Sequence, residues 1–165
     1  MTGSVAQINI SPGGVPKTSI PVGKAHALGL EGDDHAHPQT HGGPRQALLF
    51  VAEEVLEELK ARGYAVFPGA LGENITTRGI DPNKLRIGQR WRVGPEVVVE
   101  ITKVRAPCSA INVYGEGIAN QIYDESVKAG DTTSPRYAVS GMYASVLLPG
   151  VIRPGDAMIL MEESA

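Results

Sequence analysis

The sequence predicts a mainly β domain with some α-helix, in which many short strands form a barrel-like fold. Three observations lead to this class. The 165 residues include 20 glycines and 12 prolines, which recur between short apolar runs as they do at the turns of strand-rich domains. Two neighbouring strand-like runs, the second of which alternates apolar and polar residues, are joined by a Gly-Pro turn as in a hairpin. Only one stretch has strong helical periodicity.

The N-terminal third is expected to begin with strands. Residues 5–10 alternate apolar and polar side chains, and the segment Ser11-Pro12-Gly13-Gly14 then ends the strand. Residues 24–30 follow a proline-containing extended stretch and are expected to form a second strand. Residues 46–51 are continuously apolar, which is typical of a buried strand.

A helix is predicted directly after this apolar run, over residues 52–62. Its apolar side chains Val55, Leu56 and Leu59 fall on one face. Acidic residues occupy the first turn and basic residues the last turn, so the charges complement the helix dipole. Gly63 then ends the helix.

The remainder of the chain is predicted to return to strands. A strand interrupted at Gly88 and a second strand with clean alternation are expected to pair as a hairpin around the turn at residues 94–96. A weaker helix and two closing strands complete the domain. The expected ranges are 85–93 and 97–104 for the hairpin, 118–129 for the helix, and 138–148 and 157–161 for the closing strands.

Composition limits the classes of function. A chain of 165 residues most simply forms one domain, residues 1–165, with a core that needs no disulfide. The net charge of −3 lacks the basic excess of a general nucleic-acid binder. No apolar run approaches the roughly 20 residues of a membrane helix, and the N-terminus has no signal-peptide pattern. One cysteine fits a reducing compartment, so we expect a cytoplasmic protein without nucleic-acid or membrane partners.

The single cysteine, Cys108, is the first candidate for chemistry. It lies three residues after Arg105, and residues three apart on a strand point to opposite faces. Pro107 should stop regular pairing, which would let Arg105 turn toward the pocket that holds the thiol. A nearby guanidinium favours the thiolate, the form that binds metals and attacks sulfur. The structural alternative is a lone cysteine that only packs, the commonest role of a free cysteine.

A polar loop over residues 31–45 is the second candidate, since long loops in compact domains are often functional. Its imidazole and carboxylate groups suit zinc, iron or manganese, although their spacing matches no common zinc motif. These groups belong to His35, His37, His41, Asp33 and Asp34. A polar loop that gathers such residues for solubility is the alternative.

The end of this loop, His41-Gly42-Gly43-Pro44-Arg45, has a second interpretation. Two glycines let the backbone approach a ligand closely, and exposed amides beside Arg45 suit an anion such as phosphate. A glycine turn with a surface arginine remains open as the alternative. The segment Gly72-Glu73-Asn74 is equally open, because Asn74 after glycine can form an Asx-type turn without any ligand.

Taken in order, these segments resemble the MOSC family, the domain found at the C-terminus of molybdenum cofactor sulfurase. The resemblance runs from about Val5 to Leu160, nearly the whole chain, and it is the ordered set that is specific. The matching segments are Gly32-Asp33, His41-Gly42-Gly43, residues 68–80 (PGALGENITTRGI), residues 85–88 (LRIG), Arg105-Ala106-Pro107-Cys108, Gly141-Met142-Tyr143 and residues 151–156 (VIRPGD).

The resemblance implies a strand-rich, barrel-containing domain of a family in which several members bind the molybdenum cofactor. Cys108 matches the cysteine that ligates molybdenum in cofactor-binding members, and a pterin dithiolene provides the other sulfur ligands. Arg45 stands where a lysine is more usual after the double glycine and retains the positive charge. The same resemblance places a set of residues around the cofactor pocket: His41, Gly42, Gly43, Arg45, Asn74 and Arg105.

The leading functional hypothesis is an oxidoreductase that removes oxygen from N-hydroxylated small molecules, as relatives do. In this hypothesis Cys108 holds molybdenum, Arg105 and Arg45 hold anionic parts of the cofactor, and His41 assists proton transfer. Extra barrel, ferredoxin and pyridoxal-phosphate domains of some relatives are absent from the sequence. Part of the cofactor pocket, or an electron-transfer partner, is therefore expected to be missing or to come from another protein.

Three other functions stay open. In the first, Cys108 carries a persulfide and, supplied by a sulfur-donor protein, delivers sulfur to a metal-sulfur cluster or cofactor. In the second, the domain binds the cofactor or an anion without catalysis. The third and most distant is a zinc hydrolase site in the histidine loop.

Overall fold

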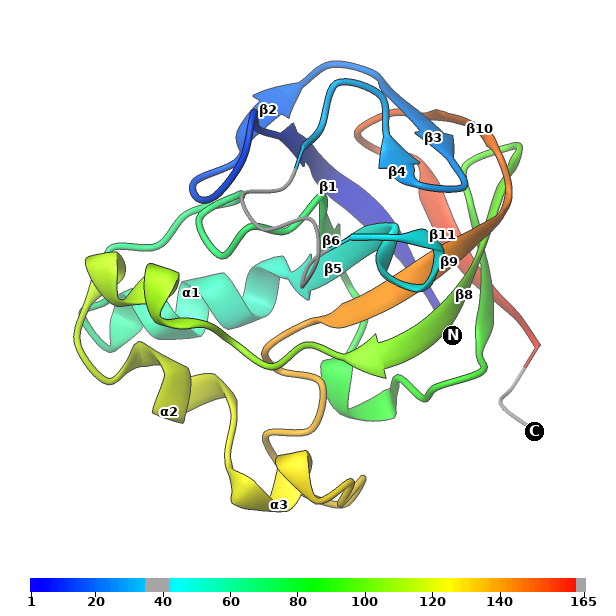
Figure 1. Cartoon of the computed structure of the whole chain (residues 1–165). Coiled ribbons are helices and arrows are strands. Elements are labelled where there is room, and N and C mark those ends of the chain that lie inside the picture. The colour runs from blue at the N-terminus through cyan, green and yellow to red at the C-terminus, as the bar shows by residue number, and fades with distance from the viewer. Residues whose placement is uncertain (35–41, 163–165) are drawn as a thin grey trace.

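The structure is a computed structural model that describes residues 1–34 and 42–162, of which Glu162 is described by its backbone alone. Seven strands close into a barrel (Figure 1). The barrel closes because β1 pairs with β6 on one side and with β11 on the other. Around the barrel the order is β1 (Thr2–Ile10), β6 (Ile75–Arg78), β5 (Leu48–Ala52), β9 (Met142–Leu148), β8 (Val97–Val104), β7 (Arg90–Val93) and β11 (Ala157–Glu162). The predicted class, a mainly β fold with a barrel and some helix, is confirmed.

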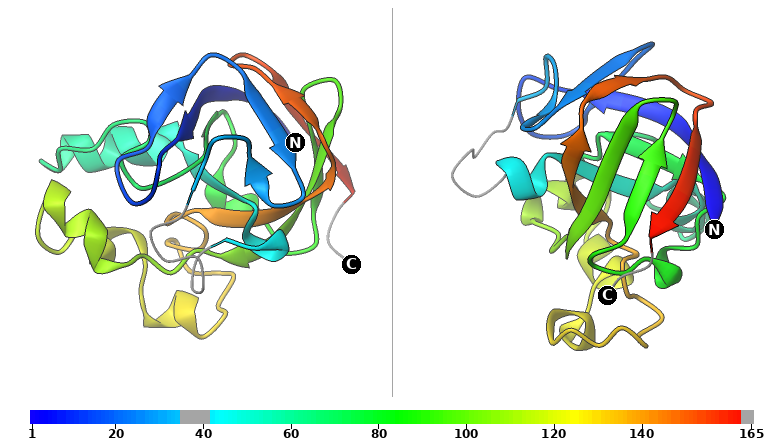
Figure 2. Two further views of the ribbon diagram at one scale, coloured as in Figure 1. Left: turned by 45° about the horizontal axis from the view of Figure 1, so that its top comes forward. Right: turned by 90° about the vertical axis from the view of Figure 1, so that its right-hand side faces the viewer.

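Four further strands extend this framework. Strand β2 (Thr18–Ile20) pairs with the end of β1, so it lies beside the barrel without closing it. A separate three-stranded sheet has the order β10 (Gly150–Ile152), β3 (Gly23–His26), β4 (Gly29–Leu30). Both views in Figure 2 place this small sheet across one end of the barrel.

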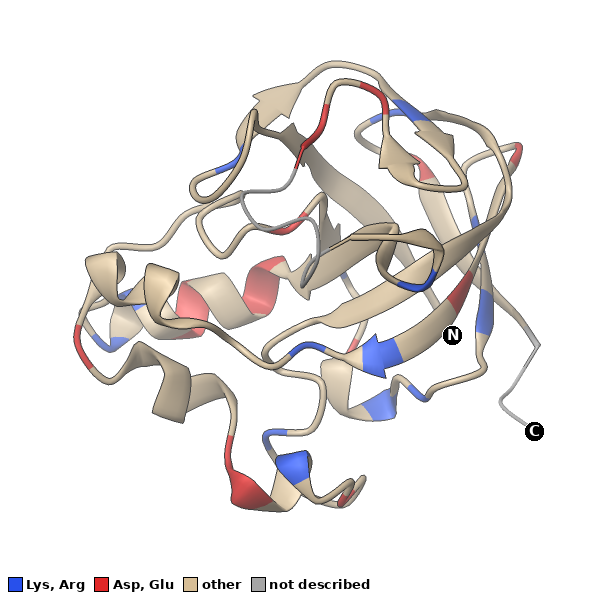
Figure 3. Cartoon of the chain, in the orientation of Figure 1, with Lys and Arg blue, Asp and Glu red and all other residues tan. Residues whose placement is uncertain are grey.

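Helices cover one side of the barrel and leave the interior to side chains. Helix α1 (Glu53–Ala61) directly follows β5, and α2 (Ile118–Ile122) lies beside it (Figure 1). The predicted apolar face of α1 is buried, and its acidic first turn and basic last turn are visible in Figure 3. The 3-10 helices are η1 (Pro44–Gln46), η2 (Pro82–Lys84) and η3 (Ser109–Tyr114), and α3 (Glu125–Lys128) follows α2.

Strand β5 is buried on both faces, which explains its continuous apolar run. Leu48 and Phe50 point into the barrel core, while Leu49 and Val51 belong to a second apolar cluster under the helices. We call this second cluster the outer cluster. It joins the barrel wall to α1, α2 and η3, and its buried members are Leu49, Val51, Ala52, Val55, Leu56, Leu59, Val66, Ala70, Leu71, Ile111, Ile118 and Ile122. β5 is also parallel to β6, with α1 as the crossover between them.

The hairpin of β7 and β8 is confirmed, with Val97 paired opposite Val93. The predicted alternation of apolar and polar residues along β8 is confirmed as well, because Val97, Val99 and Ile101 are buried inside the barrel. The first strand of the hairpin is shorter than predicted and begins at Arg90. The residues before it form η2 and a turn in which Gly88 has a φ of 93°, a conformation outside the strand region.

Three predicted elements are wrong in their extent. The single strand predicted over 24–30 is the hairpin of β3 and β4, with Ala25 paired opposite Leu30. The helix predicted over 118–129 is two short helices, because the Asp124 side chain accepts a hydrogen bond from the Val127 amide at 2.9 Å and begins a new helix. The strand predicted from residue 138 begins only at Met142, after positive φ angles at 138 and 141.

None of the helices in the described part of the chain is long and apolar enough to span a membrane.

Candidate functional site

A pocket of about 300 Å³ opens on the outer face of the barrel, where β5, β9 and the segment after β8 meet the loops of residues 13–17 and 69–74. It gathers segments that lie far apart in the sequence. The lining residues are Gly14, Val15, Lys17, Asp34, Gly42, Gln46, Leu49, Leu71, Gly72, Asn74, Arg105, Ala106, Cys108, Ser109, Ala110 and Tyr143. The pocket therefore contains four of the residues that the sequence proposes for the site: Gly42, Asn74, Arg105 and Cys108.

Cys108 presents its thiol at the surface of this pocket. The residue is exposed and has an extended backbone conformation. It occupies the N-cap position of η3, directly before the helix begins. Strand β8 ends at Val104, and Pro107 lies between the strand and the cysteine. Arg105 and Cys108 line the same pocket, as predicted from the break in strand pairing. An exposed thiol in a pocket departs from the packing role that most free cysteines have.

Arg105 forms the floor of the pocket, with only 5% of its surface exposed. Its guanidinium donates to the carbonyl oxygens of Leu71 at 2.8 Å and Ser140 at 3.3 Å, so it joins two loops. Burial lowers the pKa of Arg105, and the nearby Tyr143, Cys108 and Glu73 oppose that shift. No carboxylate of the described residues forms an ion pair with this guanidinium. A buried cation without such a partner favours an anion beside it.

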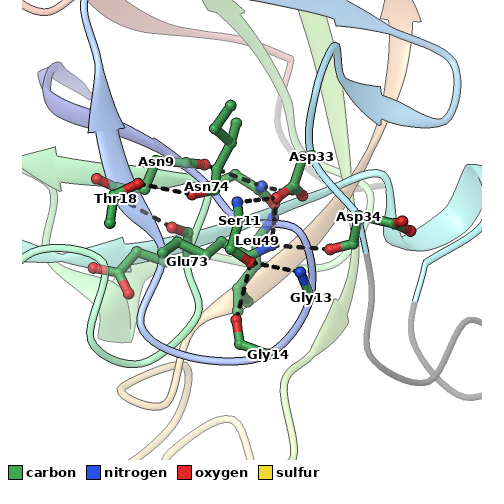
Figure 4. A network of polar contacts seen from close by, with 12 residues as sticks. Asn9, Ser11, Gly13, Gly14, Thr18, Asp33, Asp34, Leu49, Glu73 and Asn74 are labelled. Atoms are coloured by element: carbon green, nitrogen blue, oxygen red, sulfur yellow. Dashed lines mark hydrogen bonds and ion pairs between the residues drawn. The ribbon is translucent and has the colours of Figure 1, made fainter.

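A buried ion pair of Lys17 and Asp33 supports the opposite wall. The Lys17 Nζ lies 2.6 Å from the Asp33 Oδ1, and the two side chains are 7% and 3% exposed. The same Asp33 oxygen accepts the Ser11 amide, and the other oxygen accepts the Asn74 amide group at 2.8 Å (Figure 4). Lys17 carries no local signal in the sequence, because its partner lies 16 residues away.

Asn74 is held at the centre of this network. Its Oδ1 accepts the Leu49 amide at 3.0 Å, and its Nδ2 donates to Asp33 and to the Asn9 carbonyl (Figure 4). Its backbone also bonds to both neighbouring segments, with Asn74 N donating to Leu49 O and Asn9 N donating to Asn74 O. The predicted Asn74 thus lines the pocket, but its amide is occupied by the protein.

Glu73 is fully buried behind the same loop. Its Oε1 accepts the Gly69 amide at 2.7 Å and the Thr76 hydroxyl at 3.0 Å, while its Oε2 has no partner among the described residues. Burial raises the pKa of Glu73, against the lowering effect of these hydrogen bonds and of Arg105. Gly69 has a φ of 95°, and a Cβ at this position would collide with the Lys17 carbonyl. The loop beside the pocket therefore depends on a buried carboxyl and on a glycine.

The double glycine enters the site only in part. Gly42 lines the pocket, whereas Gly43 is exposed and precedes η1. Arg45 lies in η1 with an exposed side chain that does not line the pocket, and its carbonyl accepts the Thr102 hydroxyl. The three histidines of the loop, His35, His37 and His41, lie outside the described residues. Within the described residues, no three His, Cys, Asp or Glu side chains gather to hold a metal ion.

Tyr143 is a pocket residue that sequence reasoning did not select. It belongs to the segment Gly141-Met142-Tyr143 of the family resemblance, which was the only signal available. Burial raises the pKa of Tyr143, Arg105 lowers it and Cys108 raises it, so these three side chains share one electrostatic environment. Its outward direction follows from the strand period, because Met142 and Ala144 are buried inside the barrel.

Comparison with known proteins gives curated relatives of different lengths. Protein YiiM of Escherichia coli (strain K12) is 32% identical over 91 residues, which cover 53% of this chain and 40% of that protein. The uncharacterized protein YflK of Bacillus subtilis (strain 168) is 30% identical, covering 80% of this chain and 55% of that protein. A protein named Reductase from Gibberella moniliformis (strain M3125 / FGSC 7600) is 30% identical, covering 82% of this chain and 23% of that protein. The chain thus spans only about a quarter to a half of the length of these relatives.

Solved structures share the fold. The crystal structure of YiiM from Geobacillus stearothermophilus superposes with a TM-score of 0.69 at 23% identity, covering 97% of this chain and 75% of that chain. The YUAD protein from Bacillus subtilis superposes with a TM-score of 0.70 at 19% identity, covering 96% of this chain and 94% of that chain. Residues 37–159 match the family model of the MOSC domain, which is well over half of the sequence. The chain therefore belongs to the MOSC domain family.

Proposed function

We propose that this protein binds the molybdenum cofactor and reduces N-hydroxylated small molecules at a metal centre held by Cys108. One observation carries the proposal: an exposed thiol shares one pocket with a buried arginine that forms no ion pair with any carboxylate of the described residues. The relative from Gibberella moniliformis that is named Reductase supports the reaction class.

The residues of the pocket fit this cofactor. A thiolate is a soft ligand that suits molybdenum, and the cofactor brings its own sulfur ligands, so a single protein ligand is sufficient. The buried guanidinium of Arg105 suits the negative charge that dithiolene sulfurs and a phosphate would bring. Backbone at Gly14, Gly42 and Gly72 lines the pocket, which leaves room for close approach of a ligand.

Each residue has a distinct task in this proposal. Cys108 holds the metal through its sulfur atom, and Arg105 stabilises negative charge from below. The wall of the pocket is kept rigid by Lys17, Asp33 and Asn74. Their side chains are engaged in hydrogen bonds within the protein, so we assign them no contact with the substrate. When bound, the cofactor supplies the two-electron chemistry. The substrate is a small molecule, and electrons come from a separate donor protein in the cytoplasm.

Turnover tests this function directly. The protein is expressed in a host that makes the cofactor, and reduction of an amidoxime to the amidine is followed with a reduced viologen dye as the electron source. Wild-type protein is expected to turn over the amidoxime, while Cys108→Ala is expected to be inactive. Val113→Ala is the matched control, because Val113 is a 76% exposed residue of η3 outside the pocket. Equal turnover by wild type and Cys108→Ala would contradict the proposal.

The exposure of the thiol also favours a second candidate, a sulfur carrier. An exposed Cys108 is accessible to a partner protein, and attack of its thiolate on the persulfide of a cysteine desulfurase would transfer the outer sulfur and release the donor's thiolate. Mass spectrometry of the protein after incubation with a desulfurase and cysteine detects one added sulfur atom. A protein without this adduct is not a carrier.

A further inference from the structure

A phenol that makes no hydrogen bond to the described residues lines the same pocket as Cys108 and Arg105. Tyr143 lines the pocket and is half-buried there. Within the described part of the chain, its hydroxyl makes no hydrogen bond to protein. A phenol is protonated at neutral pH and can donate one hydrogen bond. The pocket therefore contains a donor that the described part of the fold does not use.

The direction of this side chain is determined by β9. Met142 and Ala144 are buried in the barrel core, so Tyr143 between them points to the outer face. There the ring packs against the outer cluster, and across the sheet the residue pairs with Leu49 of β5. A ring held by its packing keeps the hydroxyl at a defined place in the pocket.

The segment that carries Cys108 is attached to the same strand. Lys103 of β8 pairs opposite Tyr143, and two residues later the Arg105 amide donates to the Gly141 carbonyl at 2.9 Å. The Ser140 hydroxyl donates to the Arg105 carbonyl, which adds a second connection. Tyr143 and the start of the Arg105–Cys108 segment therefore belong to one hydrogen-bonded unit.

Two other polar side chains of the pocket wall are already occupied. The Lys17 ammonium is paired with Asp33, and the Asn74 amide is shared among Leu49, Asn9 and Asp33. An occupied donor contributes little to ligand recognition because its existing bond must first break. Gln46 and Ser109 also line the pocket without a side-chain hydrogen bond to the described residues. Tyr143 differs from them because its ring is packed against the outer cluster and it shares one electrostatic environment with Cys108 and Arg105.

We propose that Tyr143 is a substrate-binding residue that donates its phenolic hydrogen to the oxygen of an N-hydroxyl group held beside Cys108. This inference rests on the proposed function and deepens it by assigning the group that distinguishes substrate from product. The N-hydroxylated substrate has an oxygen that accepts the hydrogen bond, and the reduced product lacks it. A site that contributes such a donor discriminates against the analogue without the acceptor, because the donor is then left unpaired.

The experiment measures ligand preference as well as activity. Benzamidoxime and benzamidine are titrated by calorimetry into wild type, Tyr143→Phe and Tyr64→Phe, all purified from a cofactor-competent host. Tyr64→Phe is the matched control, since Tyr64 packs against the same outer cluster and does not line the pocket. The molybdenum content, thermal unfolding and amidoxime KM of each sample are recorded as well.

We expect Tyr143→Phe to lose about three- to tenfold in benzamidoxime affinity, the effect of one hydrogen bond, with benzamidine affinity unchanged. The amidoxime KM should rise by the same factor, and Tyr64→Phe should behave as wild type. Equal loss of affinity for both ligands, or an unchanged preference in Tyr143→Phe, overturns the inference. So does wild-type protein that binds neither ligand or both equally. Wild-type protein without molybdenum contradicts the proposed function instead, and the two failures are thus distinguishable.

Discussion

The ammonium of Lys17 and the carboxylate of Asp33 form a buried ion pair in the pocket wall, 2.6 Å apart, with side chains only 7% and 3% exposed. Asp33 also accepts hydrogen bonds from Ser11 and Asn74, so this pair connects β1, the loop after β4 and the start of β6. The geometry of the pocket wall depends on this contact.

Breaking this pair should destabilise the fold strongly. Lys17→Met leaves the Asp33 charge buried without a counter-ion, and a loss of about 3–5 kcal/mol in the free energy of unfolding is expected. The control is Lys24→Met, because the Lys24–Glu31 pair is 3.8 Å long and its side chains are 68% and 67% exposed. That control should change the free energy by less than about 1 kcal/mol. Urea unfolding measures both, and equal effects would contradict the buried role of Lys17.

Two glycines with the same backbone angle should respond differently to alanine. Gly69 and Gly63 both have a φ of 95°, but a Cβ at 69 would collide with the Lys17 carbonyl, whereas a Cβ at 63 meets nothing within 4 Å. Gly63→Ala should lower the free energy of unfolding only by the backbone strain of a positive φ, about 1–2 kcal/mol. Gly69→Ala should cost roughly 1–3 kcal/mol more, because the loop must shift. Thermal unfolding of the two variants tests this, and equal losses would be inconsistent with the described packing.

Stability should depend on pH through Glu73. Its folded-state pKa is raised by burial, so its contribution is fully present below the unfolded pKa of about 4.3 and is lost as pH rises through the folded pKa. Glu73→Gln resembles the protonated carboxyl at every pH. The variant should therefore gain stability relative to wild type above the unfolded pKa, by about 1.4 kcal/mol per pH unit until the folded pKa is reached.

The measurement for Glu73 is urea unfolding between pH 4 and pH 9. The exposed Glu58→Gln serves as the control for the loss of one carboxylate from the surface of α1. A difference between Glu73→Gln and wild type that does not change with pH would contradict the raised pKa of Glu73.

Arg105 should not tolerate lysine. Arg105 uses its two terminal guanidinium nitrogens to donate to the Leu71 and Ser140 carbonyls. A lysine keeps the charge but has a single nitrogen that cannot reproduce this geometry, so one buried carbonyl is left without its donor. The expected loss is about 1–3 kcal/mol in the free energy of unfolding. Arg78→Lys is the control, because Arg78 forms its pair with Glu53 at the surface. Unfolding of Arg105→Lys at the same midpoint as wild type would contradict this assignment.

Local patterns predicted the parts of the structure that local physics determines. Helix α1 follows from its apolar face and terminal charges, and the meeting of Arg105 and Cys108 follows from the proline between them. Lys17 could not be found in this way, since its burial depends on Asp33 and on the loop that Gly69 permits. Tyr143 required the strand register, which places it outward on β9 beside a segment 35 residues earlier.

The break between α2 and α3 shows a different limit. Apolar residues on both sides of Asp124 fit one helical period, so the sequence favours a single helix. A single side-chain hydrogen bond from the Val127 amide to Asp124 instead begins a new helix. Such a choice depends on neighbouring packing, which a periodicity argument does not include.

The central claim, that Cys108 holds molybdenum as part of a pterin cofactor, is tested most directly by metal and pterin analysis. Wild type, Cys108→Ala and Val113→Ala are purified from a host that makes the cofactor. We predict near-equal molybdenum and pterin in wild type and Val113→Ala, and a large loss of molybdenum in Cys108→Ala. Equal molybdenum in wild type and Cys108→Ala would contradict the claim.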